Sequence, residues 1–340
     1  MRSFLKIKRA LSFYTILSVI GSCALYSEGV DKKLADVLKR DSQPKEVLEH
    51  FQRDYILLKK GAIEFENNFQ FSYNSANQIF LDSFAILDPV FLTLGQFGIE
   101  SIKRQIISDI VTVRYGITDY LQAELAVPFI YRHDQRAKVE VNKEDLVDDA
   151  GLGDIAFSLS DQIYRETAKR PALIVNLSFK SKTGKSPYDI DLKNELPLGT
   201  GYYSIKAGVN FIKNIDPTVV FGGVAYAYNM DQDVGETVNG KFLEKVEPGD
   251  TISLNAGMGY AVTYNFSLTA QFQYDYTLSS YSTVDGNRTK VANSSLNVAQ
   301  LKIGGGWALS KDRSVNVSLG IGLTSDSPDF VLEVRTPFKF

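Results

Sequence analysis

Charged side chains recur at every second position of otherwise apolar, extended segments. Those on the polar faces are Arg114, Glu124, Lys180, Lys206, Asp275, Lys302, Glu333 and Arg335. Inside a water-filled barrel such charges set ion selectivity, whereas facing lipid they would cost about 2–4 kcal/mol each at mid-depth. We therefore predict that they line a pore. The alternative is a solvated wall of paired charges without a selective role.

Glycines form a second set on the polar face of the late segments. They are Gly257, Gly259, Gly304, Gly306, Gly320 and Gly322. Glycine weakens a strand and often marks sharp curvature or the close approach of another backbone. The set therefore indicates either a strongly curved wall or a smooth surface on which a plug docks.

Groups that could carry out catalysis are sparse. His133 lies between Arg132 and Asp134 and has no serine within two positions, which disfavours a membrane-embedded hydrolase with a Ser-His pair. Residues 180–186 resemble a phosphate-binding loop superficially, but Phe179 occupies the position of the required first glycine. Because no metal-ligand spacing occurs either, we predict no enzyme activity, no cofactor and no metal.

The elements that would position these residues are strands, because their side chains alternate. The last one, residues 329–340, has one apolar and one largely polar face, and successive side chains of a strand point to opposite faces. The pattern occurs about eleven more times from residue 61 onward, without helical segments between the repeats. We predict an all-β fold, a 12-stranded antiparallel transmembrane β-barrel with a short N-terminal helical segment. Its first and last strands should pair, with Glu64 and Glu66 near Arg335 and Lys339.

The connections alternate in length. Short ones fall at 116–119, 166–170, 213–217, 263–265 and 310–313, and long polar ones at 133–150, 181–199, 229–249 and 279–294. Segments of about 10 residues with short turns at one end and long loops at the other are typical of outer-membrane barrels. An even strand number requires segment 74–105 to begin and end on the outside. Its apolar part, 79–94, should be buried, and it is one candidate plug of the lumen.

The N-terminus predicts export. Basic residues, an apolar run over 10–20 and small residues at Ser22 and Ala24 indicate a signal peptide at 1–24, since a spanning helix needs about 20 apolar residues. The sequence Ile20-Gly-Ser-Cys23 also resembles a lipoprotein box, which would place a lipid on Cys23. Both interpretations stay open.

Residues 25–60 are expected to form a periplasmic amphipathic helical segment. Val47, Leu48, Phe51 and Tyr55 recur at helical spacing, and the rest is mostly charged. This segment is the second candidate plug. Alternatively, it tethers the barrel, residues 61–340, to a periplasmic partner.

Charge excludes one class of partner. The chain has a net charge of −3, and four basic residues leave with the signal peptide, which makes the mature chain about −7. A nucleic-acid partner is therefore not expected. Membrane lipid is expected instead, as is the barrel-assembly machinery acting on the C-terminal strand that ends at Phe340.

Several motifs resemble a known family. They are Val113-Arg-Tyr-Gly-Ile-Thr-Asp119, 121–132, Gly151-Leu-Gly-Asp-Ile155, Glu195-Leu-Pro-Leu-Gly-Thr-Gly201 and 319–340. They are similar to the outer-membrane transporter family called meta-pathway phenol degradation-like and to the related barrel that exports functional-amyloid subunits. The resemblance covers about 61–340 and implies a channel or transporter without a cofactor.

We therefore expect a channel in the outer membrane of a Gram-negative-type bacterium. Uptake of small, apolar molecules is the leading hypothesis, and export of a polypeptide such as an amyloid subunit is the second. A membrane-embedded hydrolase is the third.

Overall fold

The computed structural model describes residues 57–75, 99–138, 143–190, 194–238, 241–291 and 293–340. The described part is all-β. Its strands are β1 (Ile63–Asn74), β2 (Ile99–Gly116), β3 (Leu121–Lys138), β4 (Lys143–Leu152), β5 (Ala156–Tyr164), β6 (Ala172–Lys180), β7 (Ser204–Ile215), β8 (Thr218–Asn229), β9 (Gln232–Val238), β10 (Lys241–Glu247), β11 (Thr251–Ala261), β12 (Phe266–Thr277), β13 (Tyr281–Val284), β14 (Asn287–Lys290), β15 (Leu296–Ser310), β16 (Arg313–Gly322) and β17 (Phe330–Lys339).

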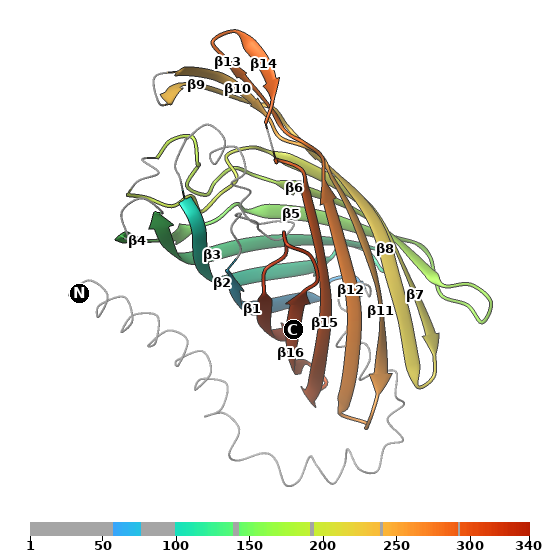
Figure 1. Ribbon diagram of the computed structural model, residues 1–340. Helices are drawn as coiled ribbons and strands as arrows, with labels where there is room; N and C mark the ends of the chain where they lie inside the picture. The colour runs from blue at the N-terminus through green and yellow to red at the C-terminus, as the bar shows by residue number, and fades with distance from the viewer. Residues whose placement is uncertain (1–56, 76–98, 139–142, 191–193, 239–240, 292) are drawn as a thin grey trace. The chain divides into compact units, whose positions relative to one another are not determined.

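Twelve strands close into an antiparallel barrel, as the sequence predicted (Figure 1). Neighbours along the chain pair around the ring in the order β1, β2, β3, β5, β6, β7, β8, β11, β12, β15, β16 and β17. The strand β4 extends the wall beside β3 and continues into β5 after a short interruption. Full closure leaves the ring without an unpaired edge.

Alternation fixes the two faces of this wall. On β11, for example, Ile252, Leu254 and Met258 are exposed, whereas Thr251 and Ser253 are buried. Apolar side chains thus face outward, and polar side chains face inward. This is the pattern of a barrel whose outer surface contacts lipid.

The predicted closure between the first and last strands is confirmed. Glu64 stands opposite Lys339 in the register of β1 and β17. Asn68, two residues from Glu66, stands directly opposite Arg335. The two β1 carboxylates turn instead to an arginine on β2, the strand on their other side.

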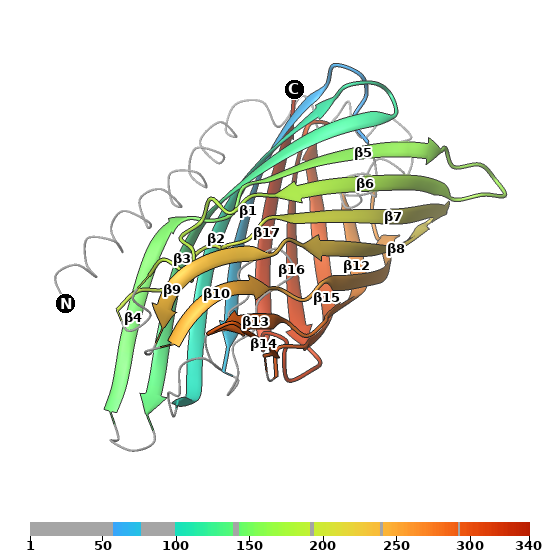
Figure 2. The same ribbon diagram turned by 90° about the horizontal axis from the view of Figure 1, so that it is seen from above.

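The short connections are confirmed at one end of the barrel, between β2 and β3, β5 and β6, β7 and β8, β11 and β12, and β15 and β16. The long segments at the other end were predicted as polar loops, which was wrong in part. Within 133–150, β3 continues to Lys138 and β4 begins at Lys143. The strands β9, β10, β13 and β14 form a separate four-stranded sheet (Figure 2). Leu243 and Val246 of β10 are buried there against Tyr188, Val234 and Val284, which explains why these segments fold.

The predicted signal peptide, most of the helical segment 25–60 and the apolar segment 79–94 lie outside the described residues. The described chain begins just before β1, where Leu58 is buried and its backbone N–H donates to Gln122 Oε1 at 2.9 Å. Among the described residues, none belongs to a helix long and apolar enough to cross a bilayer.

Candidate functional site

The interior of the barrel carries a charge cluster near the short turns. Arg114 of β2 lies 3.0 Å from Glu64 and 3.4 Å from Glu66, both on β1, and its Nε donates to Glu124 of β3 at 2.7 Å. The register places Arg114 directly opposite Glu64 and Glu124. One guanidinium therefore meets three carboxylates on the inner face of β1, β2 and β3.

A second ionic group lies on the closing strand. Glu333 of β17 accepts hydrogen bonds from Arg335 Nε at 2.7 Å, Asn68 Nδ2 at 2.9 Å and Gln70 Nε2 at 3.2 Å. Lys302 of β15 adds an electrostatic attraction to Glu333. The structure thus brings the predicted residues Glu333, Arg335 and Lys302 together.

The remaining predicted charges lie on other strands. Lys206 of β7 is half-buried, and Asp275 of β12 is buried, with Gln273 donating to it at 2.8 Å. Both share the polar face of the sheet.

An apolar cluster occupies the inner side of the wall at the same end of the barrel. Ala172 of β6, Ile212 of β7, and Val219 and Phe221 of β8 pack together, and Ala261 of β11 contacts them. The sequence analysis, which placed charged side chains along the lumen, did not predict this cluster. Near the short turns, the interior is thus charged along β1, β2 and β3 and apolar along β6, β7, β8 and β11.

The predicted glycine set has local packing partners. A Cβ on Gly257 would lie 2.6 Å from the Phe221 ring, and one on Gly322 would lie 2.1 Å from the carbonyl oxygen of Pro328. At Gly304 the nearest atoms would be 3.0–3.1 Å away, on Thr269, Ser318 and Val317. Gly320 is less crowded, with 3.4 Å to its nearest neighbours. Close packing within the wall therefore accounts for several of these glycines.

The connection between β6 and β7 carries a buried run that was predicted as a polar loop. Residues 196–202 are all buried, and Leu196 and Leu198 are 0% and 2% exposed. Leu198 packs against Ile106 and Ile130, which project from the inner side of β2 and β3. The run therefore folds against the inner wall.

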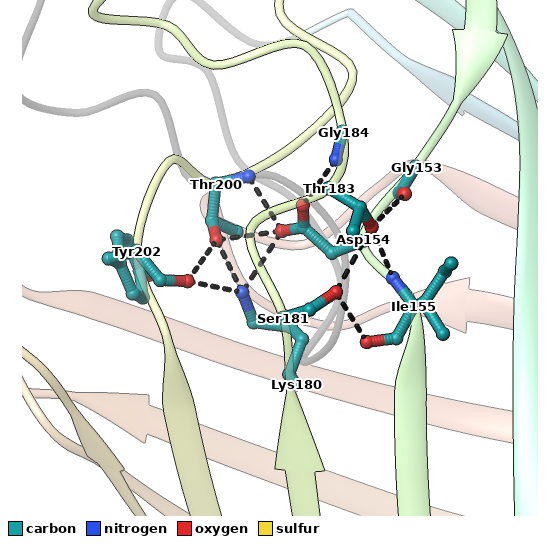
Figure 3. A network of polar contacts seen from close by, with 9 residues as sticks. All are labelled: Gly153, Asp154, Ile155, Lys180, Ser181, Thr183, Gly184, Thr200 and Tyr202. Atoms are coloured by element: carbon teal, nitrogen blue, oxygen red, sulfur yellow. Dashed lines mark hydrogen bonds and ion pairs between the residues drawn. The ribbon is translucent and has the colours of Figure 1, made fainter.

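A polar network anchors this run at its C-terminal half (Figure 3). Asp154 accepts hydrogen bonds from Lys180 Nζ at 3.0 Å, from the Thr200 N–H and hydroxyl at 2.8 Å each, and from the Gly184 N–H at 3.0 Å. Lys180 Nζ also donates to the Thr200 hydroxyl and, at 3.1 Å, to the Tyr202 carbonyl. The buried ammonium and carboxylate thus hold three separate chain segments together.

Local backbone geometry makes this network achievable. Asp154 lies in the interruption between β4 and β5, where Leu152 and Ala156 pair with Phe129 and Ala126, so one extra residue is inserted opposite β3. This bulge turns Asp154 inward. A Cβ on Gly199 would lie 2.5 Å from its Oδ1, so a larger residue would displace the carboxylate.

A second buried network anchors the other half of the run. Arg132 Nη1 donates to the Pro197 carbonyl at 3.1 Å, and Arg132 and Arg104 contact Asp134 at 2.9 and 2.8 Å. All three side chains are at most 3% exposed. At the outer edge, Lys185 bridges Asp149 at 2.6 Å and Glu195 at 3.0 Å.

Two loop groups have shifted pKa values. Partial burial alone would lower the pKa of Lys185, but its hydrogen bonds to the two carboxylates outweigh that effect and raise it. Burial, with smaller contributions from Tyr188 and Asp154, raises the pKa of Tyr202. Both groups therefore keep their neutral-pH form, and the Lys185 ammonium holds both carboxylates there.

Comparisons with known proteins agree with this architecture. A family profile described as "Putative MetA-pathway of phenol degradation" matches residues 99–340. The COG4313 outer membrane channel from Pseudomonas putida F1 is 16% identical with a TM-score of 0.59, over 84% of this chain and 98% of that one. This likeness supports the fold.

Two further solved structures are more distant. The transport unit of the autotransporter AIDA-I from Escherichia coli is 11% identical, with a TM-score of 0.47, over 88% of this chain and 99% of that one. The toluene transporter TodX from P. putida is also 11% identical, with a TM-score of 0.40, over 83% of this chain and 89% of that one.

Proposed function

The chain belongs to the family described as putative MetA-pathway of phenol degradation, and on this premise we propose that it passes small, largely apolar molecules through the outer membrane. Family membership and fold identify an outer-membrane channel protein of a Gram-negative bacterium rather than an enzyme. The relation to amyloid-subunit exporters has no such support.

The two-sided interior is the observation that carries the proposal. Near the short turns, the apolar cluster around Phe221 lies across the ring from the charged cluster around Arg114. A hydrated ion beside the apolar cluster would lose part of its hydration shell, which costs free energy. An apolar solute at the same place would remove apolar surface from water, which is favourable. A small molecule with an apolar body and one polar group matches both sides.

The buried run 196–202 is proposed as the constriction of this path. It lies against the inner wall of β2 and β3 and is fixed by two ionic networks. The charged residues predicted to line the pore would then set the small ion leak of the channel. Export of an extended polypeptide is the weaker proposal, because it would require this anchored run to move aside.

Two further roles remain proposals. Residues 31–60 are proposed as a plug that docks on the glycine-bearing late strands, and deletion of 31–59 should then raise the conductance. The exposed residue Phe340, 75% accessible, is proposed as the signal for the barrel-assembly machinery. Replacing Phe340 with Ala should lower the amount of folded barrel in the outer membrane.

Reconstitution in planar bilayers tests the channel proposal. We expect discrete conductance steps smaller than those of 16–18-stranded porins, because the ring has twelve strands and a folded-in loop. Conductance of porin size would argue against the constriction. A folded, heat-modifiable protein without any steps would argue against an open path.

A further inference from the structure

A polar pair lies on the outer face of the barrel. Asn67 of β1 donates from Nδ2 to Oδ1 of Asp109 on β2 at 2.5 Å. Their direction follows from alternation, because Phe65 and Val113, two and four residues away, are exposed on the outer face, whereas Arg114 is buried. The carboxylate and the amide therefore project from the wall toward the membrane.

The pair lies well inside the apolar band of the wall. On β1 its flanking outward residues are Ile63, Phe65, Phe69 and Phe71, and on β2 they are Ile107, Val111 and Val113. Asp109 itself stands opposite Phe69 of β1 and Phe129 of β3. Apolar side chains thus surround it both along and across the strands.

This placement needs an explanation. Acyl chains offer no hydrogen-bond partner, so an ionisable group facing them is costly, and within a membrane such groups mark functional surfaces. In the described ring, the outward-facing Asp161 and Lys213 lie near the ends of β5 and β7. Thr336 of β17, opposite Asn67, extends the polar spot across a third strand.

We propose that this face of β1, β2 and β17 binds a second copy of the chain within the outer membrane. A two-fold axis along the membrane normal brings identical residues of the two copies to the same depth. The Asn67 amide has two hydrogens and the Asp109 carboxylate several lone pairs. Each amide can therefore donate to its own Asp109 and to the carboxylate of the second copy.

The donor and acceptor of the polar pair together favour a second copy of the chain as the partner. Lipid chains supply no donor at this depth, and an unrelated protein would need its own matching groups there. A second copy supplies both donor and acceptor by symmetry. The apolar residues around the pair, Phe69, Val111 and Phe129, would pack against the same residues of the second copy.

Oxidative crosslinking in isolated outer membranes tests the contact. Phe69→Cys should give a disulfide-linked species at twice the monomer mass that contains two copies of this chain. Val224→Cys is the matched control, because Val224 is exposed on β8, six places from β1 around the ring. The unmodified chain, with Cys23 alone, gives the background. Equal crosslinking at both positions, a crosslink to another protein, or no crosslink at Phe69→Cys would overturn the proposal.

The polar pair is tested separately. In the Phe69→Cys background, Asp109→Leu should reduce the crosslinked fraction at least tenfold, while the barrel keeps its heat-modifiable shift on gels. Asn67→Leu should have the same effect, which guards against a folding defect of one variant. Undiminished crosslinking in both folded variants would overturn the role of the pair.

Discussion

Removing the Asp154 carboxylate should release the loop that narrows the barrel. In the native chain this group accepts hydrogen bonds from Lys180, Thr200 and Gly184. Asp154→Ala leaves the Lys180 ammonium, 5% exposed, without that ion pair. Breaking a buried ion pair costs about 3–5 kcal/mol. If this cost destabilises only the state in which the loop 196–202 is anchored, the population with a released loop rises roughly a hundredfold to a few thousandfold.

Two measurements report the fraction of molecules in which the loop is released. Trypsin should cleave after Lys185 faster in Asp154→Ala than in the unmodified chain, because loop opening exposes the backbone. Single-channel recordings should show larger or more frequent open steps. Glu195→Gln is the control, since its partly exposed ion pair with Lys185 is worth only about 0–1 kcal/mol.

A double variant decides whether the ionic argument is correct. Asp154→Ala combined with Lys180→Met removes both charges, so no uncompensated ammonium remains buried. Its loop should be better protected than that of Asp154→Ala alone. Unchanged protection in the single variant, or a double variant that is at least as open, would refute the reasoning.

Three further predictions concern the same interior. Lys185 and Tyr202 have raised pKa values in the folded state. Their contribution to stability is therefore complete below about pH 10 and is lost as the pH rises through these raised pKa values. The conductance should stay level between pH 6 and 8 and increase in alkaline buffer. Gly199→Ala should cost about 1–3 kcal/mol by overpacking and raise trypsin sensitivity, whereas Gly320→Ala, with 3.4 Å of room, should not. Phe221→Ala should raise the ion conductance and lower the unfolding midpoint in detergent, corresponding to about 3–5 kcal/mol.

The alternation of apolar and polar residues along the strands was sufficient to predict the barrel. Because one face of each strand is apolar, a one-residue shift in register would turn its whole apolar set inward, and this constraint fixed the strands, their parity and the pairing of β1 with β17. It also predicted the inward direction of Arg114 and Glu333, which both proved to be buried among polar partners. The alternation could not show which of the two neighbouring strands supplies the polar partners of each charged residue.

The loop escaped the sequence analysis for a physical reason. Residues 196–202 carry no period of two or 3.6, and their burial depends on Asp154 and Arg132, far away along the chain. A one-residue bulge directs Asp154 inward. The segments 151–155 and 195–201 stood out as family-like motifs, but their residue patterns did not indicate that they contact each other. The buried leucines within a loop rich in polar residues were the available signal.

The apolar cluster was missed for a different reason. β8 alternates weakly, since Phe221 faces inward while Gly222 occupies an outward position beside the Phe211 ring. An inward aromatic reverses the expected pattern of a polar lumen. Such reversals mark the places where a barrel interior departs from a simple water-filled pore.

Uptake of a labelled small aromatic compound by intact cells tests the central claim most directly. We expect a higher initial rate in cells that produce the protein than in cells that lack it, with no difference once the outer membrane is removed. Uptake of a disaccharide should change much less. Equal aromatic uptake with and without the protein in intact cells would contradict the account.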